Sequence, residues 1–278
     1  MSGGRNNDRG PCRFHIGTSG YAYAEWADAG VYPAGTRSAD MLRHYSGQFS
    51  ITELNYTWYQ MPRGDALRRQ LAQVPDGFQF AAKLTRTLTH EVERDTWRRD
   101  AESYRRGMAP LLQTGRLAAI LIQLPPSFGR TLPNRSYLAK LMDELSGLPL
   151  AVEFRHRSWA HDRVFSELSR RGVTLVSVDE PDLPGLFPPL DVVTNPDLLY
   201  IRFHGRNTSG WRSGNLQKQF DYSYPEEELS RWITTYIEPM SRKAGKGVIF
   251  FNNHVNAQAV KNALQMRTLL SRCGLKTA

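Results

Sequence analysis

The chain has 278 residues, 40% of them hydrophobic and 23% charged, a composition typical of globular proteins that bury a substantial core. No apolar run approaches the roughly 20 residues of a membrane span, and the N-terminal residues lack the apolar stretch of a secretory signal. The net charge of +9 favours phosphate-bearing partners, although the arginines are spread over several predicted helices and form no nucleic-acid-binding motif. Cys12 and Cys273 lie far apart and suit a reducing, cytoplasmic environment.

Eight short apolar runs, each bounded by turn residues, predict strands. Near-continuous apolar strands of this kind are typical of a parallel sheet that is buried on both faces. In chain order the predicted strands are residues 14–19, 51–57, 78–84, 118–124, 150–155, 173–179, 199–205 and 247–253.

Amphipathic stretches between these runs predict helices. Gly172 is a usual helix end, and Pro225, followed by three glutamates, is a favourable helix start. Between the sixth and seventh strands, residues 180–197 contain five prolines and little helical periodicity, which predicts an irregular crossover. The clearest predicted helices are residues 38–49, 94–113, 161–171, 225–238 and 256–272.

Strands that alternate with helices in this way predict a closed (β/α)8 barrel of the TIM type. We expect the barrel to form a single domain over residues 14–272, with a disordered N-terminal tail at 1–13 and a C-terminal tail at 273–278. No G-x-G-x-x-G pattern follows the first strand, which argues against a dinucleotide-binding sheet.

Polar side chains follow one parity near the C-terminal ends of most predicted strands. Alternate residues of a barrel strand face the axis, and barrel enzymes carry their active sites at the strand C-termini. Buried charges must pair or take part in function, so this ring is either a binding site or a self-neutralised network without chemistry. The ring residues are Glu53, Lys83, Glu153, Arg155, Asp179, Arg202, His204 and Asn252.

Four more residues near the same end are candidates for anion binding. Thr18 ends the first strand, and Arg206 and Trp211 lie in the glycine-rich loop after the seventh. His254 follows the eighth strand. The loops after strands seven and eight often bind phosphate in this fold, so we expect this region to contact an anionic group.

Several segments also resemble a known family. IGTSGYAYAEW, ITELNYTWYQMP, FAAKLTRTLTH, VEFRHRSW, YIRFHGRN and FFNNH-x-N-A-x-x-NA are similar, in order and spacing, to the domain of unknown function 72 family over about residues 14–270. The resemblance implies a TIM-type barrel. It implies no settled activity and no catalytic residues, since the family has only been compared loosely with sugar isomerases.

The leading hypothesis is an enzyme that performs acid/base chemistry on a small anionic substrate, such as a phosphorylated sugar or a nucleotide-like molecule. Lys83, Arg155 and Arg202 hold the anion in this hypothesis. Glu53 or Glu153 is the base and His204 the proton donor, with Asp179 as a further catalytic candidate.

Two alternatives remain open. The first is a metal-dependent sugar isomerase or hydrolase, in which Glu53, Glu153, Asp179, His204 and His254 include ligands for Mg²⁺ or Mn²⁺. No metal-binding spacing supports it, and we predict no metal or other cofactor. The second is a non-catalytic nucleic-acid-binding protein that uses the basic helices and exposed aromatic residues.

Overall fold

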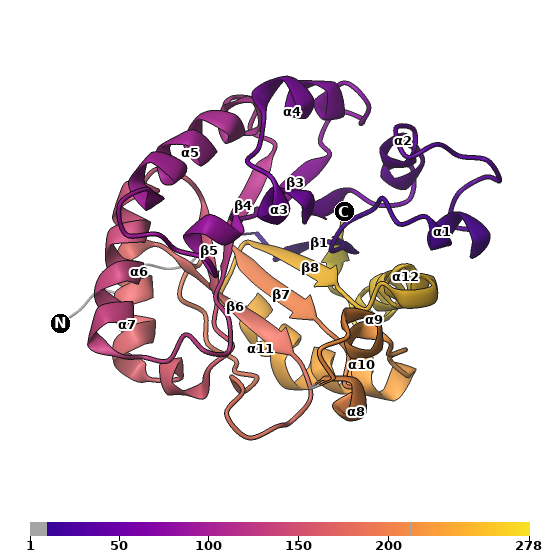
Figure 1. The fold of residues 1–278 in the computed structure, drawn as a ribbon. Coiled ribbons are helices and arrows are strands. Elements are labelled where there is room, and N and C mark those ends of the chain that lie inside the picture. The colour runs from indigo at the N-terminus through magenta and orange to yellow at the C-terminus, as the bar shows by residue number, and fades with distance from the viewer. Residues whose placement is uncertain (1–9, 212) are drawn as a thin grey trace.

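One parallel sheet runs through the part of the chain that the computed structural model describes, residues 10–211 and 213–278 (Figure 1). Its strand order is β2-β3-β4-β5-β6-β7-β8-β1-β9, and the sheet is curled into an open half-barrel. The strands are β1 (Arg13–Thr18), β2 (Ile51–Leu54), β3 (Gln79–Lys83), β4 (Leu117–Gln123), β5 (Leu150–Glu153), β6 (Thr174–Asp179), β7 (Leu199–Phe203), β8 (Lys246–Phe251) and β9 (Lys276–Thr277).

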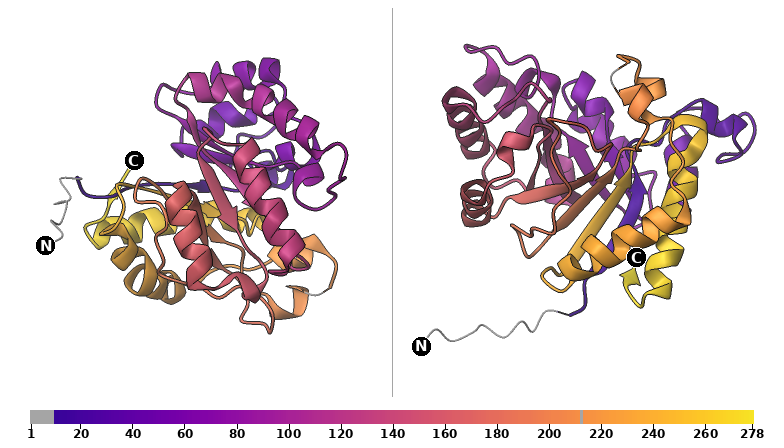
Figure 2. Two further views of the ribbon diagram at one scale, coloured as in Figure 1. Left: turned by 90° about the vertical axis from the view of Figure 1, so that its left-hand side faces the viewer. Right: turned by 90° about the horizontal axis from the view of Figure 1, so that it is seen from below.

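The longer helices lie on the outer side of this sheet (Figure 1; Figure 2). The α-helices are α1 (Glu25–Asp28), α2 (Met41–Ser46), α3 (Tyr56–Tyr59), α4 (Gly64–Leu71), α5 (Trp97–Gln113), α6 (Leu132–Glu144), α7 (Asp162–Arg171), α8 (Thr208–Trp211), α9 (Leu216–Phe220), α10 (Glu226–Trp232), α11 (Glu238–Ser241) and α12 (Gln258–Arg272). Single 3₁₀ turns are η1 (Arg86–Leu88), η2 (Arg157–Trp159) and η4 (Val255–Ala257), and a π-helical turn, η3 (Ile233–Ile237), joins α10 to α11.

The eight predicted strands are present, and their bounds differ from the prediction by a few residues. The second is shorter than expected, because residues 56–59 form α3 instead of continuing β2. The proline-rich crossover between β6 and β7 contains no helix, as predicted. The predicted C-terminal tail includes β9, which pairs with the start of β1. Of the predicted N-terminal tail, residues 1–9 lie outside the described residues.

The prediction of a closed barrel is wrong, because the sheet does not close between β1 and β2; we call this gap the β1–β2 seam. β1 and β2 share only an isolated bridge between Ser19 and Glu53, where a closed barrel requires a ladder of hydrogen bonds. The phenol of Tyr45, from α2, occupies the seam: its hydroxyl accepts a bond from the Thr18 amide (2.8 Å) and donates to the Ile51 carbonyl (3.1 Å). A side chain therefore satisfies the groups that strand pairing satisfies elsewhere.

The concave interior of the sheet has an apolar lower layer and a polar upper layer. Tyr200 and Phe250 fill the lower layer with their rings 5.2 Å apart, and both are buried. Two residues further along the same strands, Arg202 and Asn252 lie in the upper layer, because strand side chains repeat their direction every second residue. No helix in the described residues is long and apolar enough to cross a membrane.

Candidate functional site

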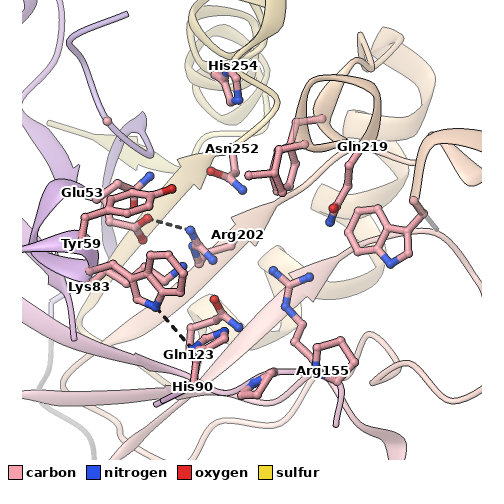
Figure 3. Close-up of a pocket in the computed structure, with 18 of the residues that line it drawn as sticks. Glu53, Tyr59, Lys83, His90, Gln123, Arg155, Arg202, Gln219, Asn252 and His254 are labelled. Carbon is pink, nitrogen blue, oxygen red and sulfur yellow. Dashed lines mark hydrogen bonds and ion pairs between the residues drawn. The ribbon is translucent and has the colours of Figure 1, made fainter. Parts of the chain in front are cut away.

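A cavity of about 910 Å³ opens at the C-terminal ends of the strands. Its volume lies in the range of small-molecule binding sites. Figure 3 shows Arg202 near its centre, with Glu53 and Lys83 on one side and Arg155 on the other. The predicted site residues that line it are Glu53, Lys83, Arg155, Arg202, Trp211, Asn252 and His254.

Lys83 places an amine without a counter-ion in this cavity. It is the last residue of β3, and its Nζ lies 4.9 Å from the centre of the Trp58 ring. Within the described residues the amine has no hydrogen bond and no ion pair. Burial, reinforced by the charge of Arg202, lowers the pKa of Lys83 to about 7. Near neutral pH the protonated and the neutral form of this amine therefore have similar populations.

Two arginines and two glutamates form a buried network under the cavity. Arg202 donates to Glu53 and to Glu153, each at 2.7 Å, and Arg155 donates through Nε to the other oxygen of Glu153 at 2.5 Å. Tyr200 donates its phenol to the second oxygen of Glu53 at 2.5 Å. Burial acts to raise the pKa of Glu153, but the charges of Arg155 and Arg202 outweigh it and hold this pKa well below its usual range. Glu153 is consequently a weak base.

His204 lies beneath the cavity floor as a neutral imidazole. Its Nε2 accepts a hydrogen bond from Arg155 at 2.8 Å, and its Nδ1 lies 3.1 Å from the Asn252 amide. Burial and the charge of Arg155 lower the pKa of His204 to about 3. Since Nε2 faces a pure donor, the proton resides on Nδ1, and hydrogen-bond consistency requires the Asn252 amide oxygen to face it. Both ring nitrogens are thus engaged with the protein.

Glu180 is a buried carboxyl that the strand pattern did not single out. One of its oxygens accepts from Arg155 at 2.7 Å, and the other is buried without a hydrogen-bond partner. Burial raises the pKa of Glu180 to about 7, although Arg155 acts to lower it. Protonation of Glu180 near neutral pH therefore removes a negative charge that Arg155 contacts.

Asp179 does not face the cavity, contrary to the predicted parity of the sixth strand. Its carboxylate accepts bonds from the Trp232 indole at 2.7 Å and from Arg206 at 2.7 and 3.0 Å, on the helix side of the sheet. The expected anion-binding guanidinium of Arg206 is occupied by this pair. Both residues lie outside the cavity lining, because at this strand the apolar parity faces inward and the polar parity faces α10.

Thr18 also lies away from the cavity. Its hydroxyl donates to the Gly20 carbonyl at 2.6 Å and lies 3.0 Å from the Tyr45 hydroxyl, in the seam between β1 and β2. The next residue, Ser19, faces inward instead and lies 3.3 Å from Arg202. The predicted residue, Thr18, therefore faces the helix layer, whereas the adjacent Ser19 faces the interior.

Aromatic side chains form two walls above the charged floor. On one side Trp58 packs edge-on against Tyr59 and His90, with ring centres 4.8 and 5.0 Å apart. On the other side Trp211 and Phe220, from α8 and α9, lie 6.4 Å apart. All of these residues line the cavity, and such walls suit a ring or the apolar face of a sugar.

The arrangement of the acidic and histidine side chains does not support the metal-dependent alternative. Among the described residues, no three His, Cys, Asp or Glu side chains gather into a set that could hold a metal ion. Glu53 and Glu153 are instead neutralised by arginines, and Asp179 faces away.

Comparison with known proteins agrees with the resemblance in the sequence. The profile of the family described as "Protein of unknown function DUF72" matches residues 15–277. The chain belongs to the DUF72 family. The Bacillus subtilis UPF0759 protein YunF is 28% identical over 271 residues, which cover 92% of this chain and 94% of YunF.

Solved structures of DUF72 proteins share the fold. One from Thermotoga maritima is 36% identical, with a TM-score of 0.84 over 93% of this chain and 99% of that one. One from Enterococcus faecalis is 28% identical, with a TM-score of 0.83 over 93% and 95% of the two chains. The names of these DUF72 relatives state no activity.

Proposed function

We propose that this DUF72 protein is an enzyme that performs acid/base chemistry on a small anionic molecule, such as a phosphorylated sugar or a nucleotide-like compound. One observation carries the proposal: the cavity contains the amine of Lys83, which lacks a counter-ion and has a pKa near 7. General bases work best when their pKa lies close to the working pH. A residue with a strongly perturbed pKa in a cleft is also a recognised marker of a functional site.

Lys83 is the proton-transferring group in this proposal, and Arg155 is the anion-binding group. Three of the five N–H donors of Arg155 contact Glu153, Glu180 and His204, which leaves two for a ligand. A planar guanidinium with two free donors matches a phosphate or carboxylate.

Glu180 adjusts the charge available to the anion. Above pH 7 its carboxylate competes with the ligand for Arg155, and below pH 7 it is protonated and competes less. Anion affinity is therefore expected to rise as the pH falls through 7. The aromatic walls stack against the ring or sugar portion, while His204 and Asn252 hold Arg155 in place from below.

The test is a thermal-unfolding screen against phosphorylated and carboxylated metabolites, followed by turnover assays on every compound that protects. Wild type and the surface control Lys261→Met should be protected by the same compounds, and Arg155→Ala should lose most of that protection. Substrate turnover should fall by about 10²–10⁴-fold in Lys83→Met, the usual contribution of a general acid or base.

The proposal fails if no anionic metabolite protects the wild type, or if Lys83→Met turns substrate over at the wild-type rate. The nucleic-acid alternative rests on the net charge of +9. It predicts RNA or DNA binding that weakens steeply with salt and that is unchanged in Lys83→Met.

A further inference from the structure

Lys83 is held in a fixed position by two hydroxyl groups. The carbonyl oxygen of Lys83 accepts a hydrogen bond from the Tyr104 phenol at 2.9 Å and lies 2.6 Å from the Thr57 hydroxyl. Tyr104 belongs to α5 and Thr57 to α3, so elements on two sides fix the main chain where β3 ends. The amine extends from this anchored point into the cavity.

The surroundings of the amine favour a free lone pair. Burial disfavours the ammonium form, as do the nearby cations Arg202 and Arg155, and together they outweigh the Trp58 ring face, which attracts a cation. Glu53 and Glu153, the carboxylates of the same floor, are each held by Arg202. A neutral lysine amine in such a pocket is a nucleophile as well as a base.

A second lysine shows how specific this arrangement is. Lys246 begins β8 at the opposite end of the strands, is half-buried, and donates from Nζ to the Gln79 side chain at 3.2 Å. It does not line the cavity, and its amine has a hydrogen-bond partner. The two residues thus share burial but differ in access to a ligand, which makes Lys246 a matched internal control.

We propose that Lys83 forms an imine with the carbonyl group of an aldehyde or ketone that also carries a phosphate or carboxylate. This inference rests on the proposed function and names its substrate class. The neutral amine attacks the carbonyl carbon, one amine proton moves to the carbonyl oxygen, and the resulting carbinolamine loses water. Amine and carbonyl compound thus yield imine and water, and hydrolysis returns both. The anionic group binds the two free donors of Arg155.

Imine formation would give Lys83 a chemical role that a carboxylate cannot fill. A protonated imine draws electrons from the neighbouring carbon, so a C–H bond there loses its proton more readily. Glu53 lies in the lining of the same cavity, where Arg202 and Tyr200 each bind one of its carboxylate oxygens. The acid/base chemistry of the site would then act on the carbon next to the imine.

The test is reductive trapping of the full-length protein at pH 7. Pyruvate, glyoxylate and glycolaldehyde phosphate are incubated with the protein and sodium cyanoborohydride, and labelled lysines are identified by peptide mass spectrometry. Lys83 should be modified at least about tenfold faster than the exposed Lys261, because about half of its amine is neutral at this pH against less than one in a thousand at the ordinary lysine pKa. Burial lowers the pKa of Lys246 as well, but Lys246 lies outside the cavity and should also be modified more slowly than Lys83.

Modification of Lys83 no faster than Lys261 by every probe would overturn the imine. If anionic metabolites protect the protein and turnover depends on Lys83 while no adduct is trapped, the imine is wrong and the acid/base function stands. Neutral glycolaldehyde serves as the comparison for the anion. If it labels Lys83 as fast as its phosphate does, the imine stands and the anionic substrate class fails.

Discussion

Replacement of Lys83 by methionine should make the protein more stable. The pKa of Lys83 falls from 10.5 to about 7 on folding, and each unit corresponds to about 1.4 kcal/mol, so burying the charged amine costs up to about 5 kcal/mol. Methionine has a similar length and no charge. The substitution also removes the contact with Trp58, worth about 1 kcal/mol. We therefore expect Lys83→Met to raise the free energy of unfolding by about 2–4 kcal/mol at pH 6.

The stability gained in Lys83→Met should decrease as the pH rises. Below pH 7 the lysine is charged in both the folded and the unfolded state, so the full cost is present. Between pH 7 and about 10.5 the unfolded state binds the additional proton, so the contribution of Lys83 to stability rises with pH. The advantage of Lys83→Met should accordingly be smaller at pH 9 than at pH 6, by about 3 kcal/mol on the same arithmetic.

Urea unfolding at pH 6 and pH 9 measures both quantities. Lys261→Met on the exposed face of α12 is the matched control and should change stability by less than about 0.5 kcal/mol at either pH. A Lys83→Met protein that is less stable than wild type at pH 6, or whose gain is equal at both pH values, would refute the reasoning. A residue that weakens the fold is expected where function requires it.

Three further substitutions test other parts of the structure. Tyr45→Phe should lower the free energy of unfolding by about 1–3 kcal/mol in urea, because it leaves two buried main-chain groups of the β1–β2 seam unpaired. Glu153→Gln should lower it by about 3–5 kcal/mol, since two buried arginines lose their shared carboxylate; an unchanged midpoint would contradict the network. Glu180→Gln should reduce the pH dependence of sulfate protection between pH 6 and 8, because Arg155 then lacks the one contacting carboxyl whose pKa is raised to about 7; a pH profile identical to that of the wild type would show that Glu180 is not its source.

The strands whose alternation has a clear polar and apolar side were predictable from the sequence. On β5, just past its end and on β7, Glu153, Arg155 and Arg202 alternate with apolar residues, and the structure places all three in the inward direction. The position of Lys83 at the end of an apolar strand was predictable for the same reason. Its low pKa was not, because that depends first on how deeply the folded chain buries the amine and then on which charges other strands bring near it.

The end of β6 and the seam of the sheet were not predictable by this reasoning. Asp179 and Glu180 are adjacent acids at the strand end, and alternation alone cannot tell which of them faces inward. Asp179 faces outward because Trp232 and Arg206, distant in sequence, bind it there. The open seam likewise depends on the Tyr45 hydroxyl, which interrupts a pairing that the strand pattern alone would complete.

The most direct test of the central claim is the pKa of the Lys83 amine. The ¹³Cε chemical shift of Lys83 can be followed by NMR from pH 5 to 11, with the signal assigned from its loss in Lys83→Arg. A transition near pH 7 for Lys83, well below the ordinary lysine pKa of about 10.4, is the predicted result. A Lys83 amine that titrates above pH 10 would contradict the account, because it would be neither a base nor a nucleophile at neutral pH.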